Sequence, residues 1–302
     1  MKKLLISCLV IATIFACKKP KPTPTPLVIT KDDYSANYKA GGTVFKNFET
    51  SNASVAVPIA GTDQTWDFST LAEINANTTG GANFLAPSNA AFATATYAFI
   101  GTTSWSAGGN ISPAVANTAF VTLDNDGLFS LGYSQNVATA ISIPSLGATI
   151  NYPVQNLVYT GTIKYPVFLF PAAYGGAAVV TSGMVFTSNY TVNAPALGLS
   201  NTPGQTKVTS TVIFDVIGSG TVNLKGIGSV KVLLAKSSIS DRTNYFLGGA
   251  PAPAALLSNL GLTDGAITTF TTYRFVAPGL GSVGIIDVNA MGNVTYANFR
   301  KG

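Results

Sequence analysis

The chain has 302 residues, a net charge of +5 and 47% apolar residues, with no histidine and only two cysteines. Five of its 17 Lys and Arg lie within the first 21 residues, so the rest of the chain carries equal numbers of positive and negative charges. A neutral body without a basic cluster lacks the electrostatic pattern of a nucleic-acid-binding protein. The absence of histidine excludes imidazole catalysis and histidine-bound zinc. We expect no nucleic-acid partner and no cofactor.

Residues 1–17, MKKLLISCLVIATIFAC, have the pattern of a lipoprotein signal peptide. Lys2 and Lys3 precede an apolar stretch that ends at Phe15, and Cys17 follows a small residue. The apolar stretch is too short to cross a bilayer of about 30 Å as a helix. We therefore expect lipidation of Cys17, and a membrane partner reached through that lipid anchor. The alternative is an ordinary secretory signal that leaves Cys17 as a thiol.

Lipidation would place the protein in the cell envelope, with the outer membrane favoured, on either the periplasmic or the surface side. Residues 18–26, KKPKPTPTP, predict an extended tether, because each proline fixes φ near −65° and biases the residue before it toward extended geometry. At about 3.1 Å per residue, the tether reaches on the order of 25 Å. Residues 27–302 then form the folded body.

The body has an all-β composition, rich in Thr, Val, Tyr and Phe and interrupted by Gly or Pro every eight to twelve residues. Alternation is clearest in residues 207–216, where Val212, Phe214 and Val216 share one face. We predict an antiparallel β-sandwich, jelly-roll-like, with little helix. A two-lobed arrangement is the alternative, because residues 194–205 are the best internal break. Residues 248–265 predict an inserted loop or short helix.

Two glycine-containing motifs predict hairpin turns. Asp124-Asn125-Asp126-Gly127 has the composition of a tight turn between strands. The alternative is a calcium loop using Asp124 and Asp126, but two carboxylates are few for an ion that takes six to eight oxygens. Residues 279–284 match G-x-G-x-x-G, yet a β-branched stretch follows them where a nucleotide site needs a helix.

The candidate ligand-binding residues are Trp66, Trp105, Asp63 and Asp67. Trp66 and Trp105 offer flat faces for stacking on sugars, with core packing as the alternative for both. Asp63 and Asp67 flank Trp66 and are the first carboxylate pair to consider for a glycan hydrolase. The chain has no nucleophile elbow and no histidine for a serine-hydrolase triad, so no catalytic residue is assigned.

Two segments carry a resemblance to known proteins. Residues 61–69, GTDQTWDFS, resemble the "TWDFS" block near the start of many uncharacterised secreted or surface β-proteins of the Bacteroidetes. Residues 218–224, GSGTVNL, and the strand after them are similar to a glycine-threonine hairpin in the same proteins. The resemblance implies an all-β surface protein and supplies no reaction and no catalytic residue.

Together these features predict a lipid-anchored envelope protein that acts as a non-catalytic binding or structural module, with a glycan or an envelope protein as partner. The alternative is a carboxylate-dependent glycan hydrolase. Two carboxylates about 5 to 10 Å apart in a deep cleft would favour the hydrolase. A shallow aromatic-lined face would favour the binding module.

Overall fold

The computed structural model describes residues 26–41, 45–76, 84–107, 109–160 and 163–302. The predicted signal peptide, its Cys17 and residues 18–25 of the tether lie outside this part of the chain. The described residues form β-strands with two short α-helices, which confirms the predicted all-β class. In chain order the elements are β1 (Val28–Ile29), α1 (Lys31–Ser35), β2 (Lys46–Glu49), η1 (Asn52–Ser54), β3 (Gly61–Asp67), β4 (Asn75–Ala76), η2 (Ala90–Phe92), β5 (Tyr97–Thr103), β6 (Ser106–Ala107), β7 (Asn110–Ile111), β8 (Val115–Leu123), β9 (Gly127–Gln135), β10 (Thr139–Ile143), η3 (Pro144–Leu146), β11 (Ala148–Tyr152), β12 (Gln155–Thr160), β13 (Tyr165–Leu169), β14 (Ala172–Ala173), β15 (Val179–Ala194), η4 (Pro195–Leu197), β16 (Leu199–Leu224), β17 (Gly228–Leu247), β18 (Ala250–Pro251), α2 (Ala254–Asn259), β19 (Ala266–Ala277), β20 (Gly281–Asn289) and β21 (Val294–Lys301).

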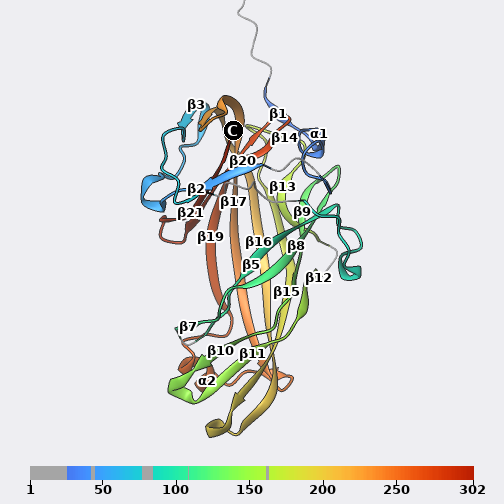
Figure 1. Ribbon diagram of the computed structural model, residues 1–302, viewed down its shortest axis with the longest axis vertical. Helices are drawn as coiled ribbons and strands as arrows, with labels where there is room; N and C mark the ends of the chain where they lie inside the picture. The colour runs from blue at the N-terminus through green and yellow to red at the C-terminus, as the bar shows by residue number, and fades with distance from the viewer. Residues whose placement is uncertain (1–25, 42–44, 77–83, 108, 161–162) are drawn as a thin grey trace, which may run out of the picture.

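Long antiparallel strands form the spine of the molecule. β16 pairs with β15 on one side and with β17 on the other, and β17 pairs in turn with β19. The 20 residues of β17, at about 3.3 Å each, span roughly 65 Å. Figure 1 shows these strands running along the length of the molecule. Residues 194–205, the predicted internal break, form the turn and the first paired residues of the β15–β16 hairpin.

Alternation along β16 sets which side chains enter the core. Val212, Phe214 and Val216 are buried, as the sequence predicts, and the residues between them are more exposed. Successive side chains of a strand point to opposite faces, so one apolar face is covered along this stretch. After a register shift between Val216 and Gly218, the buried residues Val222 and Leu224 belong to a different core.

A second group of strands covers this spine in the upper half of the molecule. β8 and β9 pair with each other, β5 pairs with β8, and β12 and β13 pair with β9. A core lies between the two groups, in which Tyr97 and Val121 meet Phe214 and Leu233. Hydrogen bonds nevertheless link 17 of the described strands into one sheet. The jelly-roll-like sandwich therefore stays a prediction, while the largely antiparallel β class is observed.

The other edge of the spine carries β19, β20, β21 and β2 in antiparallel order, with β3 lying parallel to β16. A second core beneath them contains Trp66, Phe68, Phe275 and Phe299. Gly220 permits the approach of β3, because a Cβ at this position would lie 2.1 Å from the Gln64 carbonyl oxygen. The glycine-threonine segment thus pairs with the strand that contains the first three residues of the "TWDFS" block.

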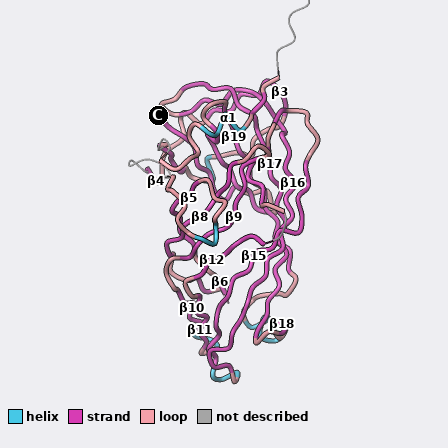
Figure 2. The backbone as a smooth tube through the Cα atoms, turned by 90° about the vertical axis from the view of Figure 1, so that its right-hand side faces the viewer, coloured by secondary structure: helices cyan, strands magenta, loops and turns pink. Residues whose placement is uncertain are grey.

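The lower end is built from the β10–β11 hairpin, the β6–β7 hairpin and the connection from β17 to β19 (Figures 1 and 2). That connection contains β18 and α2, so residues 248–265 include the predicted short helix. A third core here contains Ile143, Ile150, Val192 and Leu260.

The described chain begins at Pro26, near β1, and its C-terminus lies at the same, upper end of the molecule (Figure 1). α2, β10 and β11 lie at the opposite end. Within the described ranges, no helix has the length and apolar character needed to cross a membrane.

Candidate functional site

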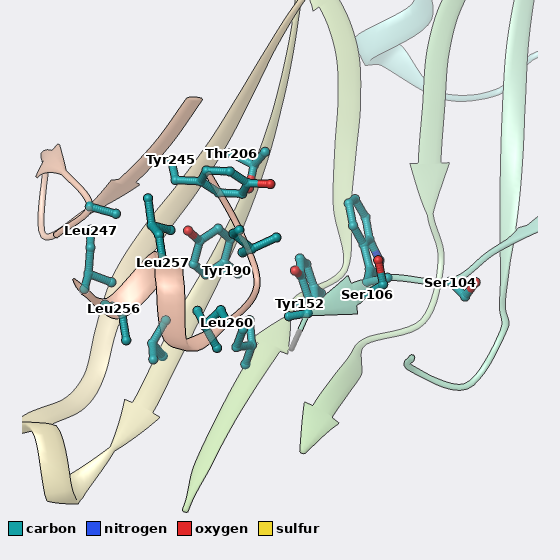
Figure 3. A pocket seen from close by; sticks show the side chains of 16 residues that line it. Ser104, Ser106, Tyr152, Tyr190, Thr206, Tyr245, Leu247, Leu256, Leu257 and Leu260 are labelled. Carbon is teal, nitrogen blue, oxygen red and sulfur yellow. The ribbon is translucent and has the colours of Figure 1, made fainter. Parts of the chain in front are cut away.

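A hollow of about 220 Å³ lies at the lower end, between the spine, the β6 region and α2 (Figure 3). We call it the Trp105 hollow. Four aromatic rings, several hydroxyl groups and a wall of leucines line it, and it is bounded by Ser104, Trp105, Ser106, Ala107, Ile150, Tyr152, Tyr190, Val192, Thr206, Tyr245, Leu247, Ala252, Leu256, Leu257, Leu260 and Leu262.

Trp105 is held in place from both its backbone and its ring. Its N–H donates to Ser112 Oγ at 3.0 Å, and Ser112 N–H donates to the Trp105 carbonyl at 2.8 Å. The indole stacks on Tyr152, with ring centroids 4.4 Å apart and planes 6° apart. Offset stacking of this kind contributes about 1 kcal/mol beyond simple burial. One face of Trp105 is therefore covered by Tyr152.

Gln135 ties these two rings to the core. Its side chain is fully buried, and its Oε1 accepts a hydrogen bond of 3.2 Å from Trp105 Nε1. Its amide nitrogen donates to the Val137 carbonyl at 2.9 Å and to the Tyr152 carbonyl at 3.4 Å. A buried amide with these partners fixes the Trp105 ring before any ligand arrives.

Tyr190 and Tyr245 extend the aromatic lining along the spine. The Tyr190 ring lies 5.7 Å from that of Tyr152, and its hydroxyl donates to the Phe246 carbonyl at 3.4 Å. Burial raises the pKa of the Tyr152, Tyr190 and Tyr245 hydroxyls. These groups stay neutral at physiological pH, so they can donate and accept hydrogen bonds but not act as anions.

Four of the five leucines come from α2 and the turn after it, and Leu247 comes from the end of β17. The helix starts after Pro253, whose carbonyl accepts from Leu257 N–H at 3.1 Å. Gly261 ends the helix with a φ of 62°, and Leu262 N–H returns to the Leu257 carbonyl at 2.8 Å. This reversal places Leu260 and Leu262 against the same hollow.

Trp66, in contrast, is a core residue. Its side chain is 8% exposed, and its ring packs edge-on against Phe275 with centroids 5.2 Å apart. Its Nε1 is buried without a hydrogen-bond partner among the described residues. This environment matches the core-packing alternative for Trp66.

Asp63 and Asp67 lie exposed on β3, and neither lines the Trp105 hollow. Asp63 has a φ of 54° where the pairing of β3 with β16 shifts register. Asp67 accepts hydrogen bonds from the hydroxyl and the N–H of Ser69, at 2.6 and 3.0 Å, and these lower its pKa. Its carboxylate is thus part of the turn after β3.

Glu73 belongs to an ion-pair network. It lies 2.7 Å from Lys301 Nζ and 3.1 Å from Lys225 Nζ. Hydrogen bonds from these two lysines hold its pKa below the ordinary value. This arrangement links the chain before β4 to the C-terminal strand.

The segment from Asp124 to Gly127 is the predicted hairpin turn, here between β8 and β9. Asp124 Oδ1 accepts from the N–H groups of Asp126 and Gly127, at 3.0 and 3.1 Å, and its other oxygen pairs with Lys164. Burial raises the pKa of Asp124, but these hydrogen bonds outweigh it and lower the pKa. The described residues contain no group of three or more acidic, Cys or His side chains arranged to hold a metal.

The sequence pointed to Trp105 but not to its partners. Gln135, Tyr152, Tyr190 and Tyr245 sit in ordinary strand patterns, far from Trp105 along the chain. Gln135 carries the one local signal for this arrangement, because it is a polar residue at the end of a largely apolar strand, β9. A buried amide needs specific hydrogen-bond partners.

Comparisons with known proteins add little to this description. Neither the protein-family models nor the curated proteins that were searched match the chain. A solved structure from Bacteroides fragilis, provisionally described as an exported protein with a YmcC-like fold, is 9% identical and covers 68% of this chain and 86% of its own, with a TM-score of 0.21. A TM-score this low assigns neither a fold nor a function.

Proposed function

We propose that this protein is a lipid-anchored envelope module that binds a glycan in the Trp105 hollow without catalysing a reaction. The observation that carries the proposal is the locked Trp105–Tyr152 pair at the edge of a hollow that also offers Tyr, Ser and Thr hydroxyls. Aromatic rings pack against the C–H faces of sugars, and neutral hydroxyls exchange hydrogen bonds with sugar hydroxyls. Preorganised rings lose little freedom on binding.

The position of the hollow supports this role. A tether attached at Cys17 would lead to Pro26 at the upper end, whereas the hollow lies at the lower end, beside α2 and β11. The spine between them is roughly 65 Å long. The binding end would therefore face away from the membrane.

The hydrolase alternative has less support. Five hollows among the described residues, the Trp105 hollow included, have no Asp or Glu in their linings. Asp63 and Asp67, the pair favoured by the sequence, are exposed on a strand at the other end of the molecule. A glycosidase needs its two carboxyl groups on opposite sides of the bound sugar.

A glycan array followed by calorimetry tests the proposal, using the full chain with Cys17→Ser so that no acyl group is attached. We expect one glycan class to bind, and Trp105→Ala to weaken that binding at least tenfold. Tyr174→Ala removes an exposed aromatic ring outside the hollow and should leave the affinity unchanged. Equal binding by the Trp105→Ala protein would contradict the proposal. Turnover abolished by Asp63→Asn or Asp67→Asn would establish the hydrolase instead.

A further inference from the structure

A second cavity, of about 370 Å³, lies in the upper half of the molecule, and no residue lines both it and the Trp105 hollow. One wall comes from β2, β19, β20 and β21 and the other from β5, β8, β9 and β13. The two walls differ in chemistry. Phe99, Val121, Leu128 and Val167 make the second wall largely apolar, whereas the first carries two arginines.

The two arginines are Arg274 on β19 and Arg300 on β21, and the chain has only one other, Arg242. Arg274 donates to Ser282 Oγ at 3.3 Å, and Arg300 donates to the Leu280 carbonyl at 2.9 Å. The Arg300 guanidinium also lies 3.6 Å from the centroid of the Phe45 ring. Both cations are half-buried, and their hydrogen-bond acceptors are neutral.

Among the described residues, no carboxylate lies within 4.0 Å of either guanidinium group as an ion-pair partner. All 12 Asp and Glu of the chain fall within the described residues, and the ion pairs found there within 4.0 Å all use lysine. Burial lowers the pKa of Arg300, as expected for a cation that loses water, but a guanidinium keeps its charge in proteins. Two half-buried cations beside an apolar wall are costly unless an anion compensates them.

We propose that this cavity binds an amphiphile that has one carboxylate head and an apolar tail. The forked guanidinium groups of Arg274 and Arg300 match the two oxygens of a carboxylate, which they can bind through paired hydrogen bonds. The apolar wall opposite them accepts the tail. A volume of about 370 Å³ lies in the range of cavities that hold small organic ligands.

Calorimetry with decanoate tests this proposal, again with the full chain carrying Cys17→Ser so that no attached lipid competes. We expect binding of one decanoate per chain. Decanol, which has the same tail without the charge, should bind at least tenfold more weakly, and acetate, which has the head alone, should not bind detectably. Decanol or acetate binding as tightly as decanoate would overturn the proposal, as would no binding of decanoate.

Variants locate the site. Arg274→Gln and Arg300→Gln should each weaken decanoate binding at least tenfold, while Arg242→Gln, outside the cavity, should leave it within twofold. A loss for Arg242→Gln as large as for the other two would overturn the proposal. Ala119→Leu narrows the cavity without touching the arginines, so it should weaken binding in a protein whose melting temperature is maintained. Unchanged binding by that variant would show that the tail does not occupy this cavity.

Discussion

Gln135 is the residue on which the geometry of the Trp105 hollow depends most. It is fully buried and bonds to the indole, to the Val137 carbonyl between β9 and β10, and to the Tyr152 carbonyl. Gln135→Met keeps the size but leaves the Trp105 N–H and two carbonyls without this partner, which should cost about 2 kcal/mol of unfolding free energy. Urea unfolding, monitored by tryptophan fluorescence, measures this loss of unfolding free energy.

Gln205→Met is the matched control, because Gln205 makes one exposed hydrogen bond, of 3.1 Å, to Asn189. Its loss should change the unfolding free energy by less than about 0.5 kcal/mol. Equal effects of the two substitutions would show that the buried amide does not organise the hollow.

Asp241 gives the fold a dependence on pH. Its Oδ1 is buried without a partner among the described residues, and burial raises its pKa although a hydrogen bond with Ser210 acts in the opposite direction. When the pKa of a carboxyl is raised in the folded state, its contribution to the free energy of unfolding is greatest below its ordinary pKa, near 3.9. That contribution is lost as the pH rises through the pKa of the folded state. Asp241→Asn should therefore raise the melting temperature at pH 7 by roughly 2 °C.

At pH 3 the carboxyl is protonated in both states, so the gain from Asp241→Asn should disappear there. Calorimetric melting at the two pH values separates this charge effect from a change in packing. A gain of the same size at both would mean that the ionised carboxylate is not the source.

Single residues also show which features of the structure could be predicted from the sequence. The turn at Asp124 was predictable, because its hydrogen bonds join neighbours along the chain. Trp66 and Trp105 both follow polar residues, yet one packs in the core and the other lines a hollow. That difference depends on Phe275 and Tyr152, which are distant in sequence.

At the scale of elements, the β15–β16 pair controls the aromatic lining through Gly204. A Cβ at this position would lie 2.1 Å from the Tyr190 ring. Gly204→Ala should therefore push that ring aside, reduce the unfolding free energy by about 2 kcal/mol and weaken ligand binding in the Trp105 hollow. Denaturant unfolding and calorimetry measure the two effects.

Gly176→Ala is the control for this substitution, since its Cβ would meet only the Ala173 carbonyl oxygen, at 3.5 Å. It should alter neither stability nor binding by a measurable amount. If the Gly204→Ala protein were as stable as the Gly176→Ala protein, the Tyr190 ring would be able to move aside without loss of unfolding free energy.

Apolar–polar alternation predicts strand structure in residues 207–216 but does not predict which residues line the two cavities. The alternation of residues 207–216 follows directly from one covered face of β16. Arg274 and Arg300 lie next to the buried residues Phe275 and Phe299, so alternation predicts that the two charges face water. Both arginines instead line the second cavity. Helix α1 depends on a local signal instead, a capping box in which Thr30 N–H donates to Asp33 Oδ2 at 2.8 Å.

For the molecule as a whole, the proposed function requires attachment at one end and binding at the other. Stable membrane anchoring needs two or more acyl chains, and Cys17 is the one expected acceptor. Cys17→Ser should therefore move nearly all of the protein from the membrane fraction to the soluble fraction, as quantified by blotting after a high-salt wash. Retention of this variant on membranes would contradict lipid anchoring.

The most direct measurement of the central claim uses the two tryptophans of the chain, Trp66 and Trp105. A ¹⁵N NMR spectrum should show two indole N–H signals, which Trp105→Phe assigns. On titration with a glycan that binds, the Trp105 signal should shift, because its ring lines the hollow, and the Trp66 signal should stay fixed in the core. Saturating glycan that leaves the Trp105 signal in place would contradict the account.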